Sequence, residues 1–117
     1  MIRIRDAQEE ALSEALWGRF QDELTEHLTA TFPSRCASLP EPRLAELVAS
    51  AVVSARAQGM AGDRTIKVYA ECALVFGPPP WREPFGEPLA DRGSPPEVRH
   101  ARFVRLANEA LEPERGA

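Results

Sequence analysis

The sequence has few of the residues that basic, disulfide-linked or membrane-spanning proteins need. Its 117 residues include two cysteines, two histidines and a single lysine, Lys67, beside thirteen arginines. The net charge of −4 argues against nonspecific binding to nucleic acid or to an anionic membrane, because both need a basic protein surface. No stretch approaches the roughly 18 apolar residues that a membrane-spanning helix requires. We therefore expect neither a nucleic-acid nor a membrane partner.

The cysteines and the start of the sequence indicate a reducing compartment. Cys36 and Cys72 lie in different predicted elements and form no Cys-x-x-Cys pair. The charged start, Met1 to Asp6, lacks the apolar stretch of a signal peptide behind it. We expect a cytoplasmic protein with both thiols reduced and partly buried. A disulfide between the two cysteines is possible only if the fold brings them together.

Helical spacing dominates the rest of the sequence, and its length predicts one domain over residues 1–117. The predicted helices cover residues 6–31, 42–58, 63–76 and 95–112. In the first, an apolar residue recurs every four positions: Leu12, Leu16, Phe20, Leu24 and Leu28. This spacing drifts by about 40° per step on a helix of 3.6 residues per turn. The apolar stripe therefore winds round the helix, which predicts contact with more than one neighbour.

The helix ends carry recognisable signals. Gly59 is placed to end the second helix, and Asp63 to cap the start of the third. Ser94, followed by proline, is the expected N-cap of the fourth helix, and the tail from Glu114 onward is expected to fray. A strand at residues 66–76 is disfavoured, because no second convincing strand exists to pair with it.

Prolines are concentrated between the third and fourth predicted helices. Seven of the eleven prolines fall in residues 78–96, which excludes a regular helix or a central strand there. Trp81, Phe85 and Leu89 recur in the same segment, and a disordered linker rarely carries such side chains. We expect an all-α fold of four helices with an ordered, extended, proline-rich strap at residues 77–94. Trp81 and Phe85 either cover the core or anchor a protein partner.

The sequence contains no phosphate-binding glycine loop and no nucleophile-elbow motif, so it predicts no catalytic residue, no cofactor site and no metal site. Glu23 and His27, four residues apart, could place two ligands on one helical face, but two ligands do not make a metal site. A solvated acidic face is the simpler interpretation. Cys36 with a distant histidine is the weakest candidate for a nucleophile pair.

Charge is distributed unevenly between the first and last predicted helices. Glu10, Glu14 and Glu23 belong to a strongly acidic face of the first helix. Three arginines of the fourth helix are spaced three residues apart and make a basic ridge of Arg99, Arg102 and Arg105. These faces either lie side by side as exposed salt bridges, or one of them docks a partner of opposite charge.

The order of these features resembles a family of small helical bacterial proteins of unknown function, often encoded in type VI secretion spike and effector gene clusters. The resemblance rests on the order of Ile-Arg-Ile-Arg-Asp, His27-Leu28, the Phe-Pro-Ser-Arg-Cys run ending at Cys36, and the spacing of Gly59, Tyr69 and Gly77. It covers about residues 1–82. After Gly77 this sequence departs from the family, because three prolines and Trp81 follow directly. The resemblance implies an accessory role without catalytic residues.

We therefore expect a non-enzymatic protein-binding accessory, such as an adaptor, a chaperone-like protein or an immunity protein, for a bacterial secreted effector. The expected binding residues are Trp81, Phe85, Glu10, Glu14, Glu23, Arg99, Arg102 and Arg105. Two alternatives stay open: a small enzyme or toxin that uses Cys36 or the Glu23/His27 pair, and a self-associating structural component. The oligomeric state is not predicted.

Overall fold

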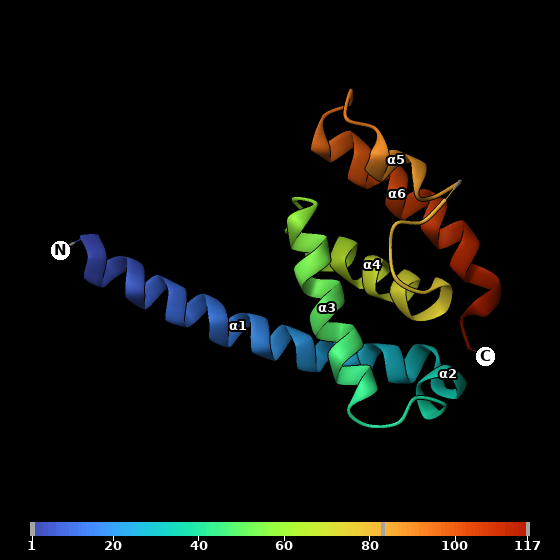
Figure 1. Ribbon diagram of the computed structural model, residues 1–117, viewed down its shortest axis with the longest axis horizontal. Coiled ribbons are helices and arrows are strands. Elements are labelled where there is room, and N and C mark those ends of the chain that lie inside the picture. The colour runs from blue at the N-terminus through green and yellow to red at the C-terminus, as the bar shows by residue number, and fades with distance from the viewer. Residues whose placement is uncertain (1, 83, 117) are drawn as a thin grey trace.

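The computed structural model describes residues 2–82 and 84–116, and their side chains from residue 16 onward. Every regular element within these residues is helical, and none is a strand, so the all-α class is confirmed. The elements are α1 (Ile2–Thr31), α2 (Pro33–Ala37), α3 (Arg43–Ala57), α4 (Asp63–Phe76), α5 (Glu87–Ala90), α6 (Pro96–Leu111) and the 3₁₀ turn η1 (Glu112–Glu114). The long helices α1, α3, α4 and α6 correspond to the four predicted ones, and the N-terminal half of α1 extends beyond the other helices (Figure 1).

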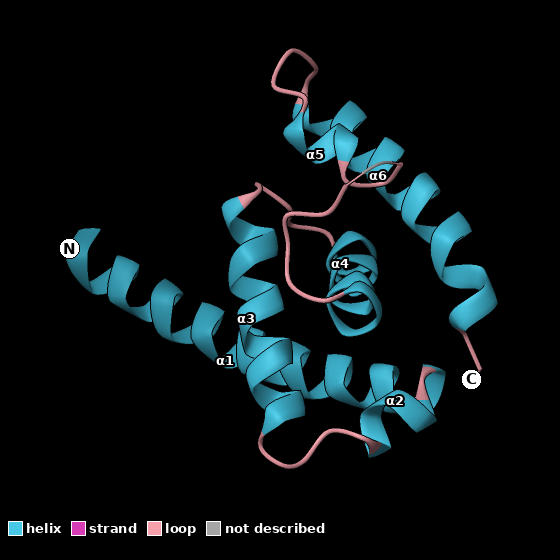
Figure 2. Cartoon of the chain, turned by 45° about the vertical axis from the view of Figure 1, so that its right-hand side comes forward, coloured by secondary structure: helices cyan, strands magenta, loops and turns pink. Residues whose placement is uncertain are grey.

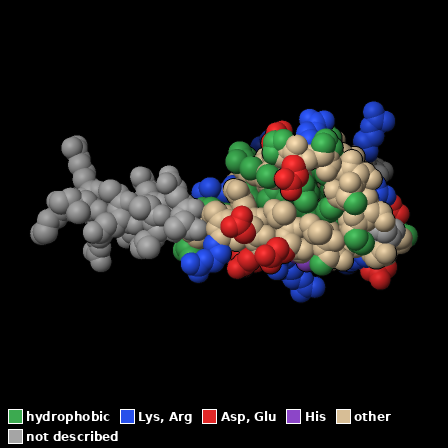
Figure 3. Space-filling model, turned by 90° about the horizontal axis from the view of Figure 1, so that it is seen from below, with side chains coloured by type: hydrophobic (Ala, Val, Ile, Leu, Met, Phe, Trp, Pro, Cys, Tyr) green, Lys and Arg blue, Asp and Glu red, His purple; other side chains and the backbone are tan. Residues whose placement is uncertain are grey.

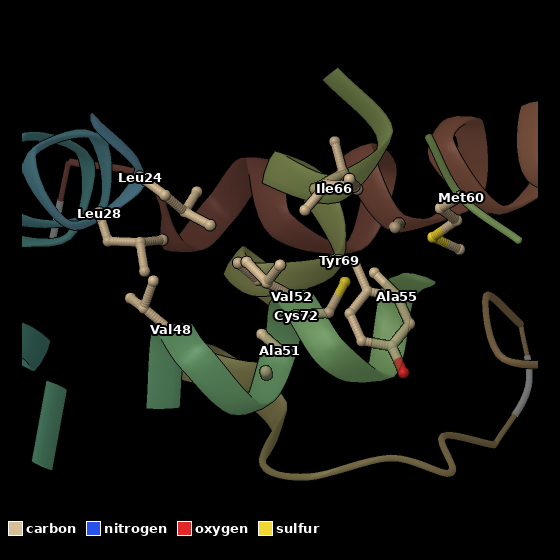
Figure 4. Close-up of a cluster of buried hydrophobic side chains, with 14 of the residues drawn as sticks. Leu24, Leu28, Val48, Ala51, Val52, Ala55, Met60, Ile66, Tyr69 and Cys72 are labelled. Carbon is tan, nitrogen blue, oxygen red and sulfur yellow. The ribbon is translucent and has the colours of Figure 1, made fainter. Parts of the chain in front are cut away.

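Helix α4 lies in the middle of the molecule. Figure 2 shows it nearly end-on, between α3 on one side, α6 on the other and α1 below. Half of its residues, including Ile66, Tyr69 and Cys72, are buried. Leu24 and Leu28 of α1 point toward the side of α3 that faces this core (Figure 4). Helix α4 carries apolar residues on several of its faces because α1, α3 and α6 pack against it from different sides.

Several predicted helix ends are confirmed and others are wrong. Gly59 takes a left-handed φ of 83° directly after the C-cap of α3, and the Met60 N–H donates to the Ala55 carbonyl at 3.1 Å, which closes the helix end as a Schellman motif. The predicted N-caps of α4 and α6 are shifted by one residue, because Gly62 caps α4 and Pro95 caps α6. The hydroxyl of Ser94 donates instead to Asp91 at 2.8 Å. The predicted start of the first helix at residue 6 is wrong, because α1 begins at Ile2.

Two short helices lie where the sequence predicts none. Helix α2 starts with Pro33 and lies between the first and second predicted helices, residues 6–31 and 42–58. Proline suits this place because the first residues of a helix need no N–H partner within it. Helix α5 forms one turn within residues 77–94, so this proline-rich segment is not extended throughout.

The proline-rich segment contains one position where only glycine fits. A Cβ placed on Gly86 would stand 1.9 Å from the carbonyl oxygen of Trp81 and 2.8 Å from that of Arg82, both main-chain atoms. Gly86→Ala is therefore expected to lower the free energy of unfolding by about 2 kcal/mol or more. Urea unfolding measures the effect. The matched control is Gly18→Ala: a Cβ on Gly18 meets no atom within 4 Å, and in a helix we expect this change to stabilise the protein by up to about 1 kcal/mol. Equal stability of Gly86→Ala and wild type would contradict the close packing of this turn.

Candidate functional site

The two aromatic residues expected in the strap belong to an aromatic cluster of the core. Phe85 is buried, and Trp81 is half-buried with its ring centroid 4.8 Å from that of Tyr69. Phe103 of α6 stacks on Trp81 at 5.9 Å, nearly parallel to it. The Trp81 Nε1–H donates to the Gly77 carbonyl at 2.9 Å. Both predicted anchors therefore have partners within the chain, on α4 and α6.

The predicted acidic site residues are only partly described. The side chains of Glu10 and Glu14 lie outside the described ones. Glu23 is exposed on α1. Acidic side chains gather on the face seen from below, next to the residues drawn in grey (Figure 3). His27 does not pair with Glu23, because its Nε2 lies 2.8 Å from an oxygen of Glu71. The Glu23/His27 pair of the enzyme alternative is therefore not formed: Glu23 faces solvent, and His27 contacts the buried Glu71.

The arginine ridge does not pair with the acidic face of α1 among the side chains described. Arg102 lies 3.8 Å from Asp91, and Arg105 lies 3.8 Å from Glu109 on its own helix. Arg99 is half-buried, and its Nε has no hydrogen-bond partner in the described part of the chain. Of the two alternatives, side-by-side salt bridges are therefore not formed between these arginines and the described acidic residues of α1.

A buried carboxylate lies at the centre of a polar network that sequence analysis missed. Glu71 of α4 is only 3% exposed, and its two oxygens contact His27 and Arg115 at 2.8 Å each. Arg115 also donates to Asn108 at 2.5 Å. Burial opposes the charge of Arg115, but its bonds to Glu71 and Glu112 outweigh this and raise its pKa. A glutamate in the middle of an otherwise apolar helical stretch was the one signal for this network.

The network also fixes the C-terminal tail, which the sequence predicts to fray. Glu114 forms an ion pair with Arg35 of α2, and the next residue, Arg115, binds Glu71. The Gly116 N–H then donates to the Thr31 carbonyl at the end of α1, at 2.8 Å. The prediction of a frayed tail is wrong for residues 114–116, since three successive residues attach it to α1, α2 and α4.

Neither cysteine has the surroundings of a reactive thiol. Cys36 and Cys72 are both buried and unpaired. Burial raises the pKa of both thiols, that of Cys72 to about 12. A nucleophilic cysteine needs a lowered pKa so that it is ionised near neutral pH. Both side chains therefore act as small apolar core residues.

An exposed apolar patch lies where α1 meets α3. Leu16 is 61% exposed and Val53 is 67% exposed, whereas most large apolar side chains of the described residues are at least half-buried. The guanidinium of Arg56, one turn after Val53, lies 4.4 Å from the centre of the Trp17 ring. Leu16 and Trp17 also line a hollow of about 230 Å³ with Phe20. We call Leu16, Trp17, Val53 and Arg56 the α1–α3 patch.

The winding stripe on α1 was the sequence signal for this patch. Phe20, Leu24 and Leu28 of the stripe are buried, but Leu16 is exposed. Each step of four residues turns the stripe by about 40°, so it turns away from the core toward the N-terminus of the helix. The prediction that this helix contacts more than one neighbour is confirmed, because α1 contacts α2, α3 and α4. Leu16 lies beyond these contacts and is exposed.

No helix in the described part of the chain is both long and apolar enough to cross a membrane. Among the described side chains, no three histidine, cysteine, aspartate or glutamate residues come together in a way that could hold a metal ion. Comparison with protein-family models, with curated proteins and with solved structures finds no match to this chain.

Proposed function

We propose that the chain is a protein-binding accessory, an adaptor, chaperone-like protein or immunity protein for a bacterial effector secreted by a type VI system. The family resemblance of residues 1–82 suggests the biological setting. The exposed α1–α3 patch carries the proposal, because Leu16 and Trp17 line one hollow, Arg56 stacks on Trp17, and the exposed Val53 lies one turn before Arg56 on α3. Large apolar side chains exposed next to one another mark protein interfaces.

The composition of the patch suits a binding hot spot. Tryptophan and arginine are enriched among the residues that contribute most to protein–protein affinity, and Trp17 and Arg56 already stack on each other. Glu23 lies seven residues after Leu16, on the same side of α1, and is exposed. It is placed at the rim, where charge increases the association rate more than the lifetime of a complex. A partner with an apolar centre and a basic rim fits this surface.

The proline-rich segment has a different role in this proposal. Residues 77–94 act as a strap against α4 and α6, with Trp81 and Phe85 turned toward the core. The exposed ridge residues Arg102 and Arg105 are a secondary contact surface. The raised pKa values of both thiols and the separation of His27 from Glu23 weigh against the enzyme alternative.

The patch is tested by placing charge on it. We expect the double variant Leu16→Asp, Val53→Asp to remain folded, because both side chains are exposed, and to bind its partner at least about 30-fold more weakly, as loss of about 2 kcal/mol at a hot spot implies. Affinity purification of the tagged chain from its native cell lysate, followed by mass spectrometry and titration of the captured protein, measures the effect.

The matched control is Val98→Asp, which changes an exposed valine on α6. Its binding should stay within about twofold of wild type. If the control and the double variant lose the partner equally, the patch is not the interface. If the wild type captures only itself and elutes as a dimer that the double variant abolishes, the self-associating alternative replaces this proposal.

A further inference from the structure

A second hollow lies on a different side of α3, between α3, α4 and the proline-rich segment. Its volume is about 370 Å³, within the range of small-molecule pockets. Ser54 and Gln58 of α3 line it, with Tyr69 of α4 at its base. Ser54 directly follows Val53 of the α1–α3 patch, so the two side chains point about 100° apart round the helix. The hollow is therefore separate from that patch.

The base of the hollow retains an unused hydrogen-bond donor. The hydroxyls of Ser54 and Tyr69 lie 2.8 Å apart, and one of them donates to the other. This bond uses one of the two hydroxyl hydrogens, and the other has no acceptor among the described residues. Tyr69 is 1% exposed, and burial raises its pKa, so its hydroxyl stays protonated. A ligand atom that accepts a hydrogen bond would satisfy this donor.

The rim of the hollow is cationic. Arg92 lines it, and none of the lining residues carries a carboxylate. The neighbouring Asp91 is occupied elsewhere: it accepts from the Ser94 hydroxyl and the Gly93 N–H, and Arg102 lies 3.8 Å from it. Arg92 forms no ion pair with any residue in the described part of the chain. Its guanidinium is therefore available for a bidentate bond to an oxyanion.

One part of the wall of the hollow is apolar. Trp81, Leu89 and the consecutive prolines Pro79 and Pro80 form it. The indole N–H of Trp81 is already bound to the Gly77 carbonyl, so the ring presents only carbon surface. Prolines and the tight turn at Gly86 hold this part of the wall in place, which lowers the ordering cost of binding.

We infer that this hollow binds an organic carboxylate with a flat apolar body, its carboxylate on Arg92 and its body against Trp81 and the prolines. Donors in a lining that contains no carboxylate select the anion, and the apolar part of the wall selects the body. A free aromatic acid and the C-terminal residue of a polypeptide share this chemistry. The inference does not depend on the proposed function, because it uses another surface.

The test is a titration of the full chain followed by ¹H–¹⁵N NMR. The probes are 3-phenylpropionate, its neutral amide, and a tetrapeptide ending in phenylalanine with either a free or an amidated C-terminus. We expect a carboxylate probe to shift the Trp81 indole signal with a dissociation constant of about 1 mM or lower. Its neutral counterpart should bind at least tenfold more weakly.

Arg92→Gln should weaken carboxylate binding at least tenfold, and Tyr69→Phe about fivefold. The matched control is Arg82→Gln, an exposed arginine of the same segment that does not line the hollow, and it should bind like wild type. If only the free peptide binds, the ligand is a polypeptide C-terminus; if only the free acid binds, it is a small metabolite. The inference would be overturned if the amide and the carboxylate bind equally, or if Arg92→Gln binds as tightly as wild type. It would also be overturned if the Trp81 indole signal does not shift at a probe concentration about ten times the expected dissociation constant.

Discussion

Trp81→Ala is expected to lower the free energy of unfolding by about 3 kcal/mol, at the low end for truncation of a packed tryptophan because the ring is half-buried. The ring contacts Tyr69, Phe85 and Phe103, which come from three separate parts of the chain. Its loss would leave a cavity between α4, α6 and the proline-rich segment. Urea unfolding followed by circular dichroism measures the change.

The control for this prediction separates core packing from binding. Trp81→Phe keeps an aromatic ring but loses the bond to the Gly77 carbonyl, so we expect it to cost about 1 kcal/mol. Neither variant, once folded, should lose more than about twofold in affinity for a protein partner. A large loss of affinity with unchanged stability would show that Trp81 is a binding anchor rather than part of the core.

Arg115→Met is expected to destabilise the protein by about 3 kcal/mol. Removing one member of a buried ion pair leaves the other charge unpaired, and Glu71 is 3% exposed with only His27 remaining beside it. The C-terminal tail would also lose one of its attachments to the helices. Denaturant unfolding measures the loss, and hydrogen exchange should show faster exchange of the Gly116 amide, which is bound to Thr31.

An exposed arginine provides the control for this network. Arg105→Met removes a cation that is 64% exposed and paired only with Glu109, so we expect a change within about 0.5 kcal/mol. The double variant Glu71→Leu, Arg115→Met should recover part of the stability that Arg115→Met loses, because the buried charge is then absent. If Arg115→Met is no more destabilising than Arg105→Met, the tail is not held by Glu71.

The sequence predicted the long helices well because their signals are local. The spacing of Leu44, Val48 and Val52 specifies one face of α3, and Gly59 specifies its end through the left-handed φ that few other residues tolerate. The preference for a helix over a strand at residues 66–76 is confirmed for the same reason. Helix starts were less certain, because Ser94 could cap α6 or bond elsewhere, and it bonds to Asp91.

Contacts between distant parts of the chain could not be predicted from local pattern. Glu71 meets His27 and Arg115 across 44 residues in each direction, and nothing in the spacing of these residues indicates the pairing. The choice between core and interface for Trp81 depended in the same way on where α6 lies. The exposed position of Leu16 was partly visible in the drift of the apolar stripe, but the exposure of Val53 on α3 was not.

The most direct test of the proposed binding surface is hydrogen–deuterium exchange of the chain alone and in complex with the protein that it captures. The account predicts slower exchange in the complex at residues 16–24 of α1 and 52–57 of α3, with no change at residues 77–90. Protection of residues 77–90 or 99–106, with residues 16–24 and 52–57 unchanged, would contradict it and place the interface on the proline-rich segment or the arginine ridge.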